Sequence, residues 1–468
     1  MQLVAYGAQD VYLTGNPKVT FFQAVYKRHT NFAMELIQQT TNGSPSSSGR
    51  VSVTIARNGD LVGNMHVCLT PTSNILTSNN SVFDTNWVAE RAVAAVELTI
   101  GGQRIDKHYQ TWWRLYAEVF LNESDKYAWG KMTTMSNPLV GNTTVGLVPL
   151  SPSKVYLPLL FFFNRNPGLY LPLIALQYHE VRLDFDLTAY YTSYFGTTNA
   201  FEVWANYVYL DTEERRRFAQ KGHEYLIEQV QHTGGDQLAA TTTTSEGSVQ
   251  LIRLSFNHPV KELVWCYTNP AASATAQLNA MWNFCTSTGN VNVTSNVLTL
   301  QASNNYIMPN VTGVPQLIST CGVIAANIGL GAGAGFTGNA YWIEQGTQLV
   351  NSTAITGGLG IEVGPLHLFK VILNGQDRFK EQFGNYFNQV QPFYHHTGTP
   401  YPGIYVYSFA LQPEEHQPTG TCNFSRIDNA QVSIQMKSNN AATLQKLFAV
   451  NYNILRIQSG MGGLAFSN

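Results

Sequence analysis

The sequence predicts an all-β chain in which one β module of about 200 residues is used twice. Two observations predict it. Several segments recur in the same order in the two halves of the chain, and many short segments alternate apolar and polar residues with a period of two. A length of 468 residues agrees with this reading, since it suits two domains better than one core.

The recurrence is clearest where a short β run, a glycine turn and a Gln/Arg/Asp cluster occur together, at residues 98–109 and again at 371–379. Three further pairs of segments keep the same order: 57–69 with 257–267, 155–163 with 403–411, and 178–187 with 424–434. The shared order favours a repeated fold unit over chance similarity.

The strand prediction rests on apolar and polar residues that alternate, so that one face of the strand is buried and the other is exposed to solvent. This pattern is typical of half-buried antiparallel strands. The best example is residues 181–187, in which four apolar residues alternate with Arg182, Asp184 and Asp186. A shift of register by one residue would bury these three charges, so the pattern also specifies the register. Similar alternation at 51–55, 96–100 and 252–256 predicts further strands, and the apolar run 157–163 has the length of a buried strand.

The remaining segments complete the expected organisation. Residues 1–26 show no sustained period and are interpreted as an N-terminal arm, and a segment near 105–128 is expected to carry a helix. We expect a first module at 27–210, a linker helix at 211–224, a second module at 225–437 with long loops at about 265–365, and a C-terminal strand and tail at 438–468. The glycine-rich end at 459–464 is expected to be flexible or tightly turned.

The linker helix is predicted from the densest cluster of charge in the chain, residues 211–220. Asp211 is placed to cap the helix, and the pairs Asp211/Arg215 and Glu213/Arg217 have the i,i+4 spacing with the acid first. A phosphate contact by Arg215 to Arg217 is the functional alternative, but the balancing acids favour a solvated helix. Between residues 263 and 343 there is no Asp, Glu, Lys, Arg or His, which we interpret as ordered loops standing above the second module.

Composition limits the classes of function. Charged residues make up 12% of the chain against a typical value of about 25%, and aromatic residues also make up 12%. With 27 basic and 29 acidic residues, the chain lacks the charge of a nucleic-acid-binding protein, so direct sequence-specific binding of nucleic acid is not expected. The five cysteines form no close pair, and no signal peptide begins the sequence, so we expect a protein made in a reducing compartment with free, buried thiols. No apolar run is long enough to span a membrane.

Catalytic motifs are weak. No G-x-S-x-G motif occurs, and the G-x-G-x-x-G match at 333–338 lies in a Gly/Ala-rich segment without the strand and helix that dinucleotide binding requires. Asp184 with Asp186, and Glu414 with Glu415, are the carboxylate pairs that glycoside hydrolysis would need, although solvated strand and loop charges explain them better. We therefore predict no catalytic residue, no cofactor and no enzyme activity.

Motifs for metal binding and for N-glycosylation are weak as well. The candidate ligands lack the spacing that fixes a metal geometry, so no metal site is predicted from His395-His396, His416, His179-Glu180 or His223-Glu224. Sequons for N-glycosylation lie at Asn42, Asn79, Asn122, Asn142, Asn292, Asn310, Asn351 and Asn423. An Asn/Ser/Thr-rich chain produces such motifs by chance, but Asn292, Asn310 and Asn351 lie in or beside the uncharged loops and are the glycosylation candidates.

Five long stretches carry a resemblance over nearly the whole chain, except at roughly 265–365. They lie at residues 7–22, 26–32, 100–106, 173–181 and 422–429, and include Gly7-Ala-Gln-Asp-Val-Tyr-Leu-Thr-Gly-Asn-Pro17 and Ile100-Gly-Gly-Gln-Arg-Ile-Asp106. Together they closely resemble the major capsid proteins of large icosahedral double-stranded DNA viruses of algae, the chloroviruses and their relatives.

That resemblance implies a tandem double jelly roll: two eight-stranded antiparallel sandwiches with short helices in the connections. It implies a homotrimer with a nearly hexagonal outline, contacts with neighbouring capsomers, and an icosahedral outer shell of the virion. It also implies synthesis in the host cytoplasm, an N-terminal arm near minor capsid proteins, and glycans attached under viral direction, often outside ordinary sequons.

Two alternatives remain beside the structural capsid subunit. Jelly rolls are common among lectins, so one alternative is a carbohydrate-binding or carbohydrate-cleaving protein. The other is a minor capsid or spike paralogue. Binding to a glycan array would favour the first alternative, and the copy number per virion would identify the second.

Overall fold

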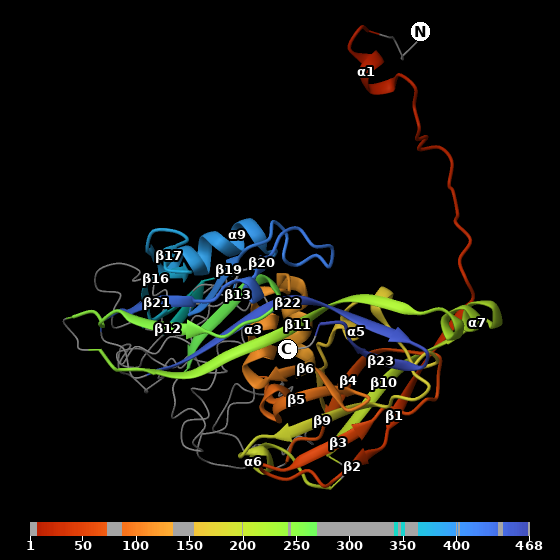
Figure 1. Ribbon diagram of the computed structural model, residues 1–468, viewed down its shortest axis with the longest axis horizontal. Coiled ribbons are helices and arrows are strands. Elements are labelled where there is room, and N and C mark those ends of the chain that lie inside the picture. The colour runs from red at the N-terminus through yellow and green to blue at the C-terminus, as the bar shows by residue number, and fades with distance from the viewer. Residues whose placement is uncertain are drawn as a thin grey trace, which may run out of the picture.

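The computed structural model of the chain describes residues 7–72, 87–133, 154–198, 200–241, 245–268, 341–344, 348–351, 364–398, 400, 403–438 and 443–466. These residues are mostly antiparallel strands joined by short helices (Figure 1).

The first module consists of two five-stranded sheets. One sheet has the order β1 (Phe32–Gln39), β10 (Phe201–Leu210), β4 (Leu61–Leu69), β7 (Val155–Pro158), with β8 (Leu171–Pro172) paired to β4. The other has the order β2 (Thr41–Asn42), β3 (Arg50–Thr54), β9 (Val181–Leu187), β5 (Val93–Ile100), β6 (Gln103–Tyr109). The sheets face each other across the core, where the Phe185 and Phe201 rings lie 5.3 Å apart.

The second module repeats this plan. A six-stranded sheet has the order β11 (His223–Leu238), β22 (Thr443–Gln458), β13 (Pro259–Thr268), β19 (Ile404–Ser408), with β20 (Cys422–Asn423) on β13 and β23 (Met461–Leu464) on β22. A five-stranded sheet has the order β12 (Gln250–Leu254), β21 (Ala430–Met436), β16 (Leu366–Leu373), β17 (Gln376–Asp377), with β18 (Gln382–Phe383) on β16. Between them the rings of Trp265 and Phe369 stack at 4.3 Å. A separate ribbon is formed by β14 (Tyr341–Glu344) and β15 (Gln348–Asn351).

Strand order therefore corresponds between the modules: β1-β10-β4-β7 matches β11-β22-β13-β19, and β3-β9-β5-β6 matches β12-β21-β16-β17. The four recurring sequence segments fall on corresponding elements, namely β5–β6 with β16–β17, β4 with β13, β7 with β19, and β9 with β21. The predicted double jelly roll is confirmed. The alternation at 181–187 is confirmed as well, because β9 buries every second residue and pairs with β3 and β5.

The glycine turn shared by both modules has a conformational reason. Gly101 and Gly102 have φ of 58° and 83° between β5 and β6, and Asn374 and Gly375 have φ of 52° and 77° between β16 and β17. Left-handed backbone at both central positions gives a hairpin turn whose twist matches that of the strands.

We predict that Gly102→Ala costs about 1–2 kcal/mol of unfolding free energy, because a Cβ there meets no atom within 4 Å and only left-handed strain is added. Gly101→Ala should cost more, because its Cβ would also come within 2.3 Å of the His179 ring. Urea unfolding of the two variants checks the order. Equal losses would mean that His179 moves aside freely.

The helices differ from expectation in their extent. The segment near 105–128 begins as strand β6 and continues as α3 (Gln110–Val119) and α4 (Glu123–Thr133). The apolar run 157–163 is not one strand, because β7 ends at Pro158 and α5 (Phe162–Arg165) follows. The expected last strand extends over the whole of β22, and the glycine-rich end turns at Ser459-Gly460 into β23.

The linker forms α7 (Thr212–Gln220), but the predicted ion pairs are wrong. The Asp211 side chain makes no capping hydrogen bond. Arg215 Nε contacts Asp60 Oδ1 at 2.9 Å, and Arg217 contacts Glu214 at 3.8 Å. Asp60 is buried directly before β4, so it needs a cation more than the exposed Asp211 does.

The modules are joined by an apolar core and not only by the linker. One cluster of buried residues combines the first module with Ile227, Val264 and Phe448 of the second, whereas a separate cluster fills the second sandwich. At the junction, the ring of Trp112 on α3 lies 5.5 Å from that of Phe448 on β22.

The N-terminal segment leaves the body beside α7, as Figure 1 shows. This follows from the pairing of Phe32 with Leu210, the residue that ends β10. Apart from the short helix α1 (Asp10–Thr14), residues 7–31 are extended, and their aromatic side chains are exposed, Phe22 at 98%. Among the described residues, no helix is long and apolar enough to span a membrane.

Candidate functional site

The strand carboxylates considered for glycoside hydrolysis are already paired with arginines. Asp186 accepts from Arg50 Nε at 2.7 Å, and Asp184 accepts from Ser52 Oγ at 2.6 Å and Arg182 Nε at 2.9 Å. Both lie on the outer face of β9, away from the core. They therefore take part in pairing across and along the strands of the sheet.

The candidate histidines are distributed through the structure. His179 lies within hydrogen-bonding distance of the Gly462 carbonyl oxygen at 2.9 Å, His223 of that of Phe218 at 2.8 Å, and His395 of that of Leu411 at 3.0 Å. Within the part of the chain that the structure describes, no group of three His, Cys, Asp or Glu residues could hold a metal ion.

His396 has a different environment, which the sequence did not indicate. Its side chain is fully buried between Glu262 and Glu414, with Nε2 3.0 Å from Glu262 Oε2 and Nδ1 3.3 Å from Glu414 Oε1. Burial opposes the charged ring, yet the two carboxylates outweigh it and raise the pKa of His396 to about 9. This cluster ties the segment after α9 (Gln391–His395) to β13.

A second buried charge cluster lies where the modules meet. Glu228 on β11 contacts Lys261 Nζ at 2.7 Å and Arg165 at 3.0 Å, and His416 Nδ1 lies 3.8 Å away. Burial alone would raise the pKa of Glu228, but these cations hold it well below its usual range. Because Arg165 belongs to the first module and Lys261 to the second, the cluster fixes one module against the other.

Of the glycosylation candidates, Asn292 and Asn310 lie outside the described residues, and Asn351 ends β15, of which only the backbone is described. Asn42 is exposed at the end of β2. Asn122 and Asn423 are also exposed, and their side-chain oxygens accept local backbone hydrogen bonds from Asp125 and Ser425. The thiols of Cys68, Cys266 and Cys422 are free; the first two are buried and Cys422 is partly exposed.

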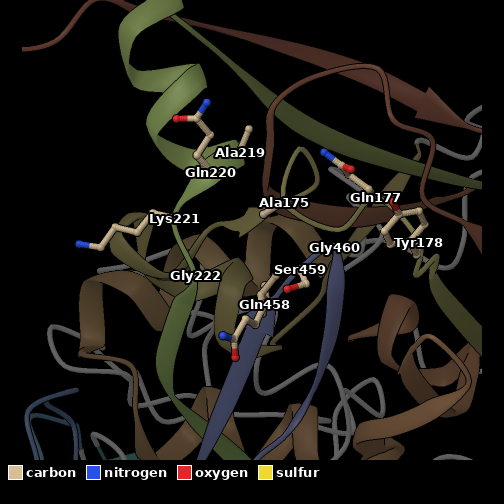
Figure 2. Close-up of a pocket in the computed structure, with 11 residues that line it drawn as sticks. Ala175, Gln177, Tyr178, Ala219, Gln220, Lys221, Gly222, Gln458, Ser459 and Gly460 are labelled. Atoms are coloured by element: carbon tan, nitrogen blue, oxygen red, sulfur yellow. The ribbon is translucent and has the colours of Figure 1, made fainter.

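A pocket of about 470 Å³ opens beneath the end of α7 (Figure 2). Gln220 and Lys221 line one side, and the turn at Ser459-Gly460 lines the other. No carboxylate lines it, so an acid–base pair is missing from its wall. The pocket is a seam between modules, where the Tyr178 amide donates to the Gly460 carbonyl oxygen at 3.0 Å.

Exposed apolar side chains gather on two surfaces of the body. One is the outer face of β1, where Phe32, Met34 and Leu36 are 46–52% exposed. The other is the helical connection formed by the π-helical turn η6 (Tyr386–Val390) and α9, where Phe393 and Tyr394 are 79% and 72% exposed. Together with the aromatic arm, such surfaces are typical of contacts with other proteins.

This tandem double jelly roll, with apolar surfaces open on its outside, has the architecture of a structural protein of viral shells, because a capsid model superposes on it. Residues 20–211 match the N-terminal part of the major capsid protein, and residues 214–463 match the large eukaryotic DNA virus major capsid protein. The chain belongs to this family of major capsid proteins, and its function is structural, in the capsid of the virion.

Similarity to individual proteins extends over the full length. The chain is 42% identical to the major capsid protein of Paramecium bursaria Chlorella virus 1, covering 100% of this chain and 99% of the relative. It is 38% identical to that of Phaeocystis pouchetii virus, with the same coverage. A quasi-atomic model of the PBCV-1 capsid superposes with a TM-score of 0.69 at 38% identity, covering 96% of this chain and 100% of that one. The Faustovirus major capsid protein shares the fold, with a TM-score of 0.61 at 13% identity over 97% and 94% of the two chains.

Proposed function

We propose that three copies of the chain form a capsomer of nearly hexagonal outline, and that these capsomers tile an icosahedral outer shell. The observation that carries the proposal is the presence of two modules with one strand order, packed side by side through a shared core. Three such chains supply six similar lobes, so a threefold particle can occupy a sixfold lattice position. The role is to build the shell, without catalysis.

Light scattering at several concentrations tests this proposal. We expect a stable particle of roughly three times 51.8 kDa. A mass of one chain at every concentration would contradict the trimer and favour the carbohydrate-binding alternative, which a glycan array would then examine.

The arm is proposed to lie on the inner face of the capsomer and to contact minor capsid proteins. Its aromatic residues, such as Phe21 and Phe22, are more than 90% exposed, so the folded body does not use them. Exposed aromatic side chains on an extended segment gain most when a partner covers them.

We predict that deleting residues 1–26 leaves a folded trimer but impairs shell assembly, because the deletion ends before β1 begins at Phe32. Light scattering should give an unchanged mass, and electron microscopy should show few complete shells. An unfolded protein, or monomers only, would mean that the arm belongs to the core of the body.

The proposed organisation is an arm at 1–26, a first jelly roll at 27–210, a linker at 211–224 and a second jelly roll at 225–437, completed by the strand and tail at 438–468. The position of β22 between β11 and β13 supports counting this last strand with the second sandwich. Synthesis in the host cytoplasm is proposed because the described cysteines, Cys68, Cys266 and Cys422, carry free thiols, as is usual for proteins made in a reducing compartment. Glycans at Asn292, Asn310 and Asn351 are proposed, and mass spectrometry of peptides from purified virions tests each position.

A further inference from the structure

We propose that η6–α9 of one subunit covers the outer face of the β1-β10-β4-β7 sheet of the next subunit. This inference rests on the proposed trimer and names the surfaces that hold it together. The chain already contains one contact of this kind, between its own two modules, and that contact serves as the template.

In the template, the connection that follows β6 and precedes β7 packs on the outer face of the second module's sheet. Its helix α3 brings the ring of Trp112 to 5.5 Å from that of Phe448, and Lys446 Nζ donates to Thr111 Oγ1 at 2.9 Å. Just before α3, the Tyr109 ring lies 4.8 Å from that of His232 on β11. Phe448 is fully buried by this packing.

The segment η6–α9 occupies the corresponding place in the second module, because it follows β17–β18 and precedes β19. Unlike α3, it keeps large apolar side chains in solvent, with Phe393 at 79% and Tyr394 at 72% exposure. The first module therefore has a helical connection that covers a neighbouring sheet, and the second module has the corresponding connection with no sheet packed against it.

Strand registers identify the sheet face that corresponds to the covered one. Cys68 and Cys266 occupy matching positions in β4 and β13. The residues on the neighbouring strands that pair with the positions two before these cysteines therefore correspond as well. They are Trp204 on β10 and Phe448 on β22. On the strands at one edge of these sheets, β1 and β11, the same registers match Leu36 with Val230. On the strands on the other side of β4 and β13, namely β7 and β19, they match Tyr156 with Ile404.

Exposure separates the members of these matched pairs. In each pair the second-module residue is the more buried one: Ile404 is fully buried and Tyr156 is 38% exposed, Phe448 is fully buried and Trp204 is partly buried, and Val230 is partly buried and Leu36 is 46% exposed. The first module thus leaves open a sheet face of the kind that α3 covers elsewhere, with Phe32, Met34 and Leu36 exposed along β1. Each chain therefore offers one uncovered sheet face and one helical connection without a partner. When the connection of one chain packs on the sheet face of the next, the contact is heterologous, and repeating it closes the chains into a ring. Three chains with two modules each give six contacts around the ring, alternately within and between subunits.

Cysteine pairing tests the contact. The double variant Leu36→Cys/Tyr394→Cys should form interchain disulfides under mild oxidation, with covalent dimers and trimers on non-reducing gels. Each single cysteine variant controls for the native thiols and should give no such ladder. The variant Leu36→Glu should raise the dissociation constant of the trimer at least about tenfold, because it places a charge in an apolar contact.

Leu251→Glu is the matched control, because Leu251 is 61% exposed on β12, outside the proposed contact, and the trimer should persist. A wild-type trimer that neither cross-links through these positions nor weakens with Leu36→Glu or Tyr394→Glu overturns the inference and leaves the capsomer standing. A wild-type monomer at all concentrations overturns the capsomer itself.

Discussion

Replacing Glu228 with Leu is expected to lower the free energy of unfolding by about 3–5 kcal/mol. Lys261 is 1% exposed, and its ammonium lies 2.7 Å from the Glu228 carboxylate; Arg165 approaches from the other module at 3.0 Å. Without the carboxylate, Lys261 would remain buried beside a second cation. The loss should appear as a lower midpoint in urea unfolding, with both modules unfolding at lower denaturant.

The matched control lies on the same strand. Glu224 pairs with Arg456 at 2.8 Å, but both side chains are more than half exposed, so Glu224→Leu should cost at most about 1 kcal/mol. The double variant Glu228→Met/Lys261→Met should lose less than Glu228→Leu, because it also removes the fully buried ammonium of Lys261 and leaves only the partly exposed Arg165 without its partner. Equal losses for Glu224→Leu and Glu228→Leu would show that the buried cluster contributes no more than a surface pair.

Acidification offers an independent check on the cluster. Because the pKa of Glu228 is lower in the folded protein than its ordinary value of 4.5, its contribution to stability is present above pH 4.5. It is lost as the pH falls below that value and the folded carboxylate takes up a proton. The Glu228→Leu variant should lack this part of the acid sensitivity.

The fold was predictable because the elements that specify it are local and occur twice. The positive φ values at Gly102 and Gly375 are required by their hairpin turns, and the alternation in β9 fixes which face is buried. Neither of these two signals depends on which other parts of the chain pack against the sheet. The same local patterns therefore occur in both modules, on strands that occupy corresponding places in the two pairs of sheets.

The buried charges could not be predicted in the same way. Lys261 and Glu262 are neighbours on β13, and alternation would leave one of them in solvent, yet both are buried. The reason is a register shift between Val260 and Glu262, which places both charges between the inward-facing Val260 and Leu263. Both therefore lie on the side of β13 that the other module and the segment after α9 cover. That covering depends on contacts distant in sequence, for which alternation carries no signal.

The candidate assembly surface was missed for a related reason. On β1 the large apolar residues Phe32, Met34 and Leu36 face outward, whereas Glu35 lies opposite Tyr207 on the inward side. A period-two pattern shows that one face is apolar, but it does not distinguish the core of the chain from a contact with another copy. Exposure in the folded chain makes that distinction.

The stability of the protein is also expected to fall as the pH rises from 6.5 to about 9, through the buried His396. Its pKa is higher in the folded protein than its ordinary value of 6.5, so the charged ring stabilises the fold fully below pH 6.5. Above that pH the unfolded chain loses the proton first, and the contribution disappears as the pH passes the folded value. The change amounts to about 3 kcal/mol, since one unit corresponds to about 1.4 kcal/mol.

Urea unfolding at intervals between pH 6 and pH 9.5 measures this loss in the wild-type protein. The double variant Glu262→Gln/His396→Gln removes both buried charges and should show a much flatter profile, whereas His396→Gln alone leaves Glu262 buried without its cation and should be destabilised at every pH. Because tyrosines and thiols also titrate at the upper end, the difference between the wild-type and double-variant profiles is the quantity that reports on His396. If the two profiles run parallel from pH 6.5 to 9, the histidine is neutral in the folded protein over this range, and its contact with Glu262 is not an ion pair.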